Sequence, residues 1–303
     1  MPFTQLFTPP ISFSKKLCDI SIESIVNSRR APQGNPRHPG GHLKPDTLLE
    51  TLDAGILSKY VQSDDFPQYG GILLQKPPGS LGSTAIATAA AAHHDTLVLS
   101  DLTLPSFKVM RDDFVSGRYT AMGLLELDKI YARQNSTAMN LEGLIKGLTE
   151  EGFRHFGSED QRLPSLPVRA HVQAAMTTAL ARKHFERWMD NGFSRRFLWV
   201  TFKLRDPSKI RDAVHDWKRL DFGTVVSKRP ANGRIPYNMT PEESKAVQRA
   251  VKEQPGGNAT AYAILKKIFC VWRWKFKEDP KRPMQLLKDL EEALSRNGDD
   301  LIL

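Results

Sequence analysis

Residues 73–84 of this 303-residue chain read LLQKPPGSLGST. The stretch begins as an apolar run, continues as a loop of Pro, Gly and Ser, and leads into small residues typical of a helix at 85–94. The backbone N–H groups of such a loop, together with the positive end of the helix dipole, can bind an anion. The stretch therefore predicts either an anion-binding loop or a plain connection between a strand and a helix.

Apolar runs and helical patterns alternate after this loop. The apolar runs occupy residues 96–101, 119–128, 167–177 and 195–204, and the helical patterns between them occupy residues 106–117, 140–153 and 178–193. Strands that alternate with helices usually build a parallel sheet between two layers of helices. We therefore predict an α/β fold with a parallel sheet and helices on both faces.

The chain divides into three predicted parts. Residues 1–69 are expected to hold N-terminal helices and a flexible basic linker rich in Pro, Gly and Arg. Residues 70–206 are expected to hold the α/β core. Residues 207–303 are expected to form a small basic helical domain, in which Thr240 and Glu243 have the spacing of a capping box.

The composition favours a cytoplasmic protein with an acidic partner. The net charge is +9, and nucleic acid is the commonest acidic partner of basic proteins. No apolar run reaches about 18 residues, so we expect no transmembrane helix and no membrane partner. Prolines replace the apolar run of a secretory signal, which argues against export, and Cys18 and Cys270 are expected to be reduced thiols.

The loop resembles the Walker A motif of P-loop NTPases in its GPPGSGKST form. The positions that match are Pro77, Pro78, Gly79, Ser80, Ser83 and Thr84. Lys76 and Leu81 replace glycines of the motif, and Gly82 replaces its lysine. The resemblance implies that these loop residues bind ATP with Mg²⁺, the metal lying on Ser83 or, with the alignment shifted by one, on Thr84.

The missing lysine would have bridged the β- and γ-phosphates of the nucleotide. Backbone donors do not depend on side chains, so binding of ATP could survive while hydrolysis is impaired. Lys76, at the start of the loop, is an alternative source of positive charge. The resemblance thus leaves open whether ATP is hydrolysed or only bound.

Three later features follow in the order found in RecA-like and AAA+-like ATPases. Glu126 and Asp128 close the third apolar run, as a Walker B acid that holds Mg²⁺ or its water would. Thr177 ends the fourth run, where the family senses the γ-phosphate. Arg195 and Arg196 precede the fifth run, where a neighbour's arginine finger implies a homo-oligomer.

Each feature also has an ordinary structural explanation. The acids fit a charged turn after a strand, Thr177 fits a helix N-cap, and the arginine pair fits an exposed sheet edge. Until the order of elements in space is known, both explanations stay open.

Basic and aromatic residues alternate near the C-terminus. The cations expected to contact phosphates are Lys266, Lys267, Arg273, Lys275 and Lys277. The aromatic residues between them can stack on bases, DNA being preferred over RNA as the partner. The alternative is an amphipathic helix whose aromatic residues belong to the core.

Two functions are compatible with these patterns. The first is an oligomeric, ATPase-like protein associated with nucleic acid, such as a motor or regulator of a mobile-element or phage DNA process. The second is a non-catalytic P-loop scaffold or adaptor that binds nucleic acid or a protein partner. A basic adaptor with no nucleotide site would require every match above to be accidental.

Overall fold

The computed structural model describes residues 43–63, 69–150, 152, 168–201, 229–255 and 258–294 of the chain. All of them belong to one compact unit, Gly40–Leu303. Of the predicted N-terminal part, residues 1–42 lie outside the described residues, as does the predicted boundary at residue 206, whereas residues 43–63 are described and contain a helix at Pro45–Leu57. No helix in the described ranges is long and apolar enough to cross a membrane.

The described strands form one parallel sheet in the order β2-β3-β4-β1-β5. Their bounds are β1 Gly71–Lys76, β2 Thr96–Leu99, β3 Ala121–Leu124, β4 His171–Thr177 and β5 Phe197–Thr201. β1 pairs with β4 on one side and with β5 on the other, and its sequence GILLQK is almost wholly buried. Strands of a parallel sheet are covered on both faces, which explains the continuous apolar run. The predicted α/β fold with a parallel sheet is confirmed.

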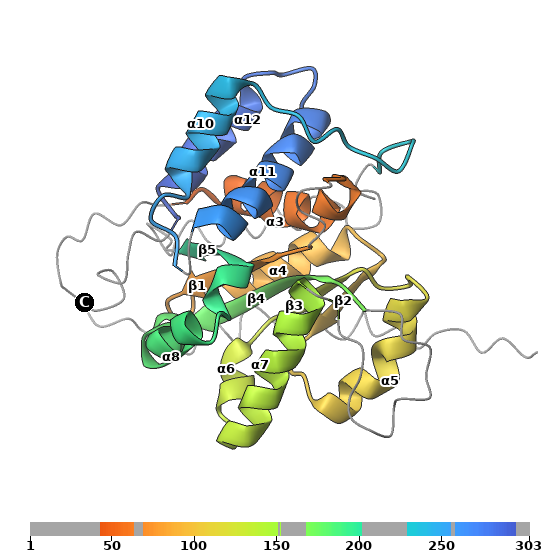
Figure 1. The fold of residues 1–303 in the computed structure, drawn as a ribbon, viewed down its shortest axis with the longest axis vertical. Coiled ribbons are helices and arrows are strands. Elements are labelled where there is room, and N and C mark those ends of the chain that lie inside the picture. Colours follow the sequence, from red (N-terminus) through yellow and green to blue (C-terminus); the bar gives the residue numbers. More distant parts are fainter. Residues whose placement is uncertain are drawn as a thin grey trace, which may run out of the picture. The chain divides into compact units, whose positions relative to one another are not determined.

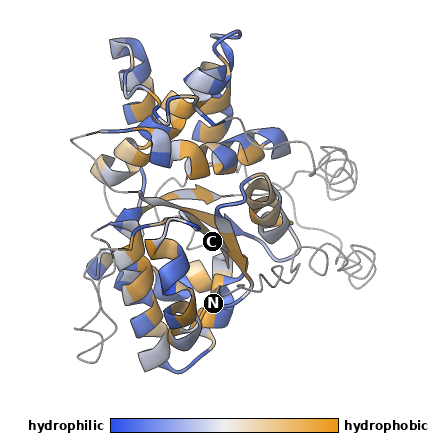
Figure 2. Ribbon diagram, turned by 90° about the vertical axis from the view of Figure 1, so that its right-hand side faces the viewer, coloured by the Kyte–Doolittle hydropathy of each residue, from blue (hydrophilic) through white to orange (hydrophobic). Residues whose placement is uncertain are grey.

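Helices cover both faces of the sheet (Figure 1). On one face lie α3 Pro45–Leu57, α4 Gly82–Ala91, α10 Pro241–Ala250, α11 Asn258–Lys275 and α12 Arg282–Glu291. On the other face lie α5 Leu104–Val115, α6 Leu127–Tyr131, α7 Asn135–Thr149 and α8 Thr178–Asp190. Short 3₁₀ turns, η1 Ser58–Tyr60 and η3 Ser194–Arg196, follow α3 and precede β5. Figure 2 shows hydrophobic residues concentrated where helices meet the sheet.

The C-terminal helices share a hydrophobic core with α3 and the sheet. Phe269 and Trp272 of α11 are fully buried, and the indole N–H of Trp272 donates to the carbonyl of Glu50 in α3 at 3.0 Å. The predicted capping box of α10 is present, because Thr240 and Glu243 each accept a hydrogen bond from the other's backbone N–H. The domain boundaries at residues 69 and 206 stay predictions.

Helix α3 crosses the sheet closely at Gly55. A Cβ added there would lie 2.8 Å from both Nε2 of His171 and Cδ1 of Ile72. His171 is fully buried, and the amide of Gln173 donates to the carbonyl of Leu52 at 2.6 Å, so the contact surface is already filled. Glycine at position 55 therefore sets how near α3 can approach β1 and β4.

We expect Gly55→Ala to destabilise the fold by about 1–3 kcal/mol, because overpacking a filled contact outweighs the better helix propensity of alanine. The matched control is Gly143→Ala in α7, where a Cβ meets nothing within 4 Å. The control should stabilise the protein by up to about 1 kcal/mol. Chemical denaturation of both variants measures the two free energies of unfolding. Equal changes in the two variants would contradict the close approach at Gly55.

Candidate functional site

The predicted loop connects β1 to α4 at the carboxyl edge of the sheet. Lys76, the last residue of β1, lies opposite Thr177, the last residue of β4. The loop closes on itself, because both the backbone N–H and the hydroxyl of Ser80 donate to the carbonyl of Pro77, at 3.3 and 2.8 Å. Gly79 takes a left-handed conformation with φ of 78°, so the glycine at this motif position meets a conformational requirement.

Leu81 is strained at the position where the motif has its third glycine. It is the only described non-glycine residue with a positive φ, 59°. A side chain in this left-handed conformation costs about 1–2 kcal/mol. Leu81 is also the N-cap of α4, and a leucine side chain cannot accept a hydrogen bond from the free N–H groups of the first turn. The first turn of α4 therefore starts with uncapped backbone donors.

The loop lies at a switch point of the sheet. α4 leaves the end of β1 and packs on the face covered by α3, whereas α8 leaves the end of β4 and packs on the opposite face. Neighbouring strands whose connections diverge in this way leave a crevice beyond their carboxyl ends. In open α/β sheets, ligands bind in this crevice.

Ser83 joins the loop to the end of β3. Its hydroxyl donates to the carbonyl of Leu125, directly after β3, at 2.6 Å. A hydroxyl that donates one hydrogen bond keeps its oxygen lone pairs for another group, including a cation. The structure thus points Ser83, rather than Thr84, toward the strand that ends in the predicted acids.

Asp128 is held by Thr177 across the crevice. Its carboxylate accepts hydrogen bonds from the backbone N–H of Thr177, at 3.0 Å, and from the Thr177 hydroxyl. The same hydroxyl oxygen accepts from the N–H of Leu180, which makes Thr177 the N-cap of α8. Thr177 is therefore a helix N-cap, as the alternative explanation expected. If Thr177 also senses a γ-phosphate, it would have to do so through Asp128.

Glu126 and Lys76 complete this edge. Glu126 is half-exposed and forms an ion pair with Lys129, one turn along α6, at 2.9 Å. Burial lowers the pKa of Lys76, while the negative charges of Asp128 and Glu126 oppose that shift. Of the residues expected to bind nucleotide and metal, the structure thus brings Lys76, Ser83, Glu126, Asp128 and Thr177 together with the loop.

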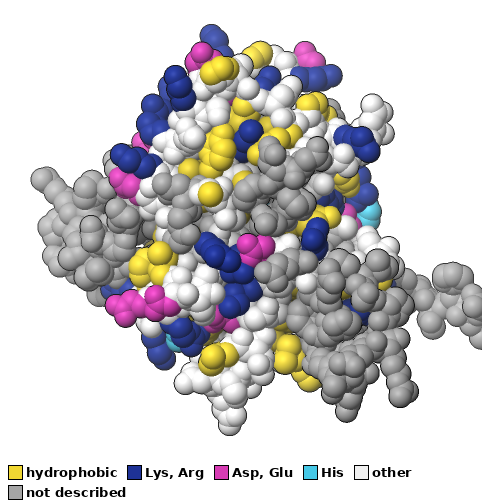
Figure 3. Space-filling view, in the orientation of Figure 1, with side chains coloured by type: hydrophobic (Ala, Val, Ile, Leu, Met, Phe, Trp, Pro, Cys, Tyr) yellow, Lys and Arg dark blue, Asp and Glu magenta, His cyan; other side chains and the backbone are white. Residues whose placement is uncertain are grey.

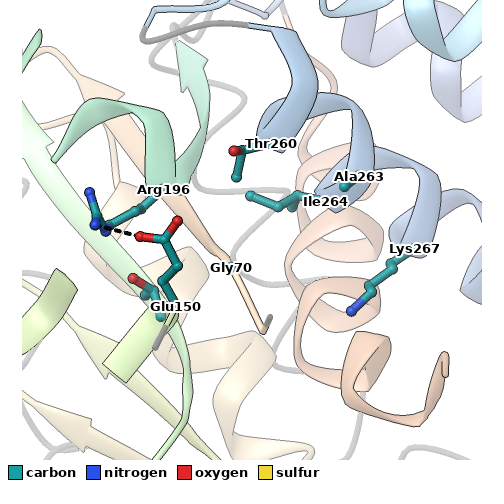
Figure 4. Close-up of a pocket in the computed structure, with 8 residues that line it drawn as sticks. Gly70, Glu150, Arg196, Thr260, Ala263, Ile264 and Lys267 are labelled. Atoms are coloured by element: carbon teal, nitrogen blue, oxygen red, sulfur yellow. Dashed lines mark ion pairs between the residues drawn. The ribbon is translucent and has the colours of Figure 1, made fainter. Parts of the chain in front are cut away.

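Arg195 and Arg196 lie at the opposite, amino edge of the sheet, directly before β5. Arg196 is buried and forms an ion pair with Glu150 (Figure 4). The Arg195 side chain is 53% exposed and lies 4.0 Å from Glu150. β1 has six residues, so this edge is about 20 Å from the loop along the sheet. Neither arginine can reach the loop of its own chain.

The predicted nucleic-acid cations of α11 are mostly engaged within the fold. Lys267 is buried beside the small cavity that Arg196 and Glu150 line (Figure 4), and Lys275 forms ion pairs with Glu50 and Asp53. Lys266 lies over the ring of Tyr237 at 4.1 Å, and Arg273 binds Glu243 at 3.1 Å. Lys277 differs: its side chain is 75% exposed and lies 3.7 Å from Glu278.

Comparison of the sequence with protein-family models and with curated proteins found no significant match. The site therefore has to be judged from its own geometry. Two participants were not predicted from the sequence. The carbonyl of Leu125 is a backbone group and has no sequence signature, whereas the Glu126–Lys129 pair could have been found from its i, i+3 spacing on a helix.

Lys267 makes the stability of the protein depend on pH. Burial lowers its pKa to about 8, well below the ordinary value of 10.5. At pH 7 the lysine is charged in both the folded and the unfolded chain, so the burial penalty is fully present. Between pH 8 and 10.5 the folded chain loses this proton first, and the penalty disappears.

We expect Lys267→Met to raise the free energy of unfolding at pH 7 by about 1–3 kcal/mol, with the advantage shrinking as the pH rises through 8 to 10. Lys277→Met, at the exposed position, is the control and should change little at any pH. Denaturant titrations at several pH values give the difference curves. If the free energies of unfolding of the parent and of Lys267→Met differed by the same amount at every pH, the lowered pKa of Lys267 would be contradicted.

Proposed function

We propose that the loop binds ATP with Mg²⁺, and that the protein is a P-loop ATPase-like protein associated with nucleic acid. The observation that carries the proposal is the convergence at one switch point. The loop after β1, the hydroxyl of Ser83 against the end of β3, and the Asp128–Thr177 pair at the end of β4 share one edge of the sheet. These features were expected from separate parts of the sequence.

The residues at this edge suit a phosphate chain. The uncapped N–H groups at the start of α4, near Gly82 and Ser83, lie at the positive end of the helix dipole, where phosphates bind. The strain at Leu81 supports the same conclusion, because strained backbone conformations cluster at functional sites.

The residues also fit the metal that the resemblance implies. Mg²⁺ keeps several waters and binds through substrate phosphates and one or two protein oxygens, so it needs no protein cage. Ser83 and Glu126 would hold it, and the ion would screen the charge of the phosphates. Among the described residues no group of three His, Cys, Asp or Glu side chains forms a separate metal site.

Binding is better supported than rapid hydrolysis. Both oxygens of Asp128 accept hydrogen bonds from Thr177, and Glu126 is paired with Lys129, so activation of water would require one carboxylate to leave its partner. An arginine finger would have to be the Arg195 of another copy of the chain. For this reason a non-catalytic scaffold that binds ATP is the second candidate function. Measurement of ATP hydrolysis by the protein with ATP bound distinguishes an active ATPase from such a scaffold.

We expect ATP with Mg²⁺ to bind the protein and to raise its thermal unfolding midpoint, because a ligand that binds only the folded state stabilises it. Ser83→Ala should remove the contribution of Mg²⁺ to affinity while leaving metal-free binding. Thr84→Ala is the matched control, since the adjacent hydroxyl has no such contact with the end of β3. Equilibrium binding of a fluorescent ATP analogue, with and without Mg²⁺, measures both effects.

No binding at millimolar ATP would contradict the proposed function. A larger loss in Thr84→Ala than in Ser83→Ala would show instead that the metal lies on the alternative hydroxyl.

The nucleic-acid part of the proposal rests on charge. The chain carries a net charge of +9, and Figure 3 shows Lys and Arg side chains over the upper part of the molecule, where α10–α12 lie in Figure 1. Acidic side chains lie between them, and most of the cations first expected to contact phosphates have partners within the fold. Lys277, two residues beyond the end of α11, remains the most accessible of that set.

Lys277→Gln should weaken binding to duplex DNA and lower the slope of log affinity against log salt by about 0.9, the contribution of one phosphate contact. Lys267→Met removes a buried cation from α11 and should leave the slope unchanged. Fluorescence anisotropy over a series of salt concentrations measures the slopes. An unchanged slope in Lys277→Gln would favour a protein partner for this surface.

A further inference from the structure

We propose that Lys76 supplies the phosphate-binding cation that the loop lacks at Gly82. The inference rests on the proposed nucleotide site and adds a specific residue to it. Relative to the motif, glycine and lysine have exchanged places: the first position carries Lys76 where the motif has glycine, and the seventh carries Gly82 where the motif has lysine.

The geometry shows that the side chain of Lys76 lies where the side chain of a lysine at position 82 would begin. A Cβ added to Gly82 would lie 2.5 Å from Cδ of Lys76 and 3.5 Å from its Cε. The stem of Lys76 therefore crosses the first residue of α4 and fills the space in which a lysine at position 82 would begin. Two side chains cannot share this space, so a lysine at one of the positions favours glycine at the other.

The charge of Lys76 is available to a ligand. Its side chain is half-buried, and it makes no hydrogen bond or ion pair with any residue in the described ranges. The acids that influence it are engaged elsewhere, Asp128 with Thr177 and Glu126 with Lys129. A partly desolvated ammonium beside the positive end of a helix gains most from an incoming anion.

The ligand chemistry follows from this placement. The uncapped N–H groups of α4 and the ammonium of Lys76 both favour negative charge, and together they suit a chain of two or three phosphates better than one. Lys76 is thus expected to discriminate ATP from AMP, whereas the backbone donors alone would bind any phosphate.

The test compares the affinities of ATP and AMP in four proteins: the parent, Lys76→Met, the exchanged variant Lys76→Gly/Gly82→Lys, and the control Lys129→Met. Lys129 is a second lysine at the same edge, and it is exposed and paired. Loss of one charge-assisted hydrogen bond should weaken ATP binding in Lys76→Met about 10- to 100-fold. AMP affinity should hold, the exchanged variant should recover ATP binding, and Lys129→Met should match the parent. Thermal unfolding confirms that each variant is folded.

The outcomes separate this inference from the proposed function. If the parent binds no ATP, the proposed function fails and Lys76 has no phosphate to contact. If the parent binds ATP but Lys76→Met binds it as tightly as Lys129→Met does, the nucleotide site stands and the role of Lys76 is overturned. If the exchanged variant folds but binds ATP as weakly as Lys76→Met, the inference that lysines at positions 76 and 82 serve the same phosphate site is also overturned.

Discussion

The parallel pairing of β1 with β4 and β5 is the constraint on which the candidate site depends. The register places Lys76 opposite Thr177, so the two strands end together, and the chain leaves them on opposite faces of the sheet to continue into α4 and α8. The crevice follows from this divergence and not from any single side chain. A hydrogen bond of Ser83 then joins the start of α4 to the end of β3, and the hydrogen bonds of Asp128 join α6 to the end of β4.

The same packing explains why the net charge is a poor guide to the binding surface. Lys275 of α11 pairs with Glu50 and Asp53 of α3, and Asp53 also binds His93 after α4 at 2.7 Å. These contacts tie α11 to α3, and α3 to the segment after α4, and they use Lys275, one of the cations predicted to contact nucleic acid. A partly buried charge needs such partners, because burial without them is costly.

The fold could be predicted from the sequence because β1, β4 and β5 are buried on both faces and read as continuous apolar runs between helical patterns. The position of the loop, the capping box of α10 and the edge reached by Glu126 and Asp128 follow from the same patterns. The close crossing at Gly55, the burial of Lys267 and the hydrogen bond of Ser83 to Leu125 could not be predicted. Each depends on a contact between distant segments or on a backbone atom, which periodicity and motif spacing do not encode.

The loop after β1 shows that a backbone conformation usually taken by glycine can also be taken by another residue. The glycine at position 79 is kept where φ is positive, yet position 81 carries a leucine in the same conformational region at a cost of about 1–2 kcal/mol. The backbone is left-handed at both positions, and the stem of Lys76 crosses Gly82 at the start of α4. The uncapped donors of α4 and the stem of Lys76 therefore meet at Gly82, and the proposed phosphate site rests on this arrangement.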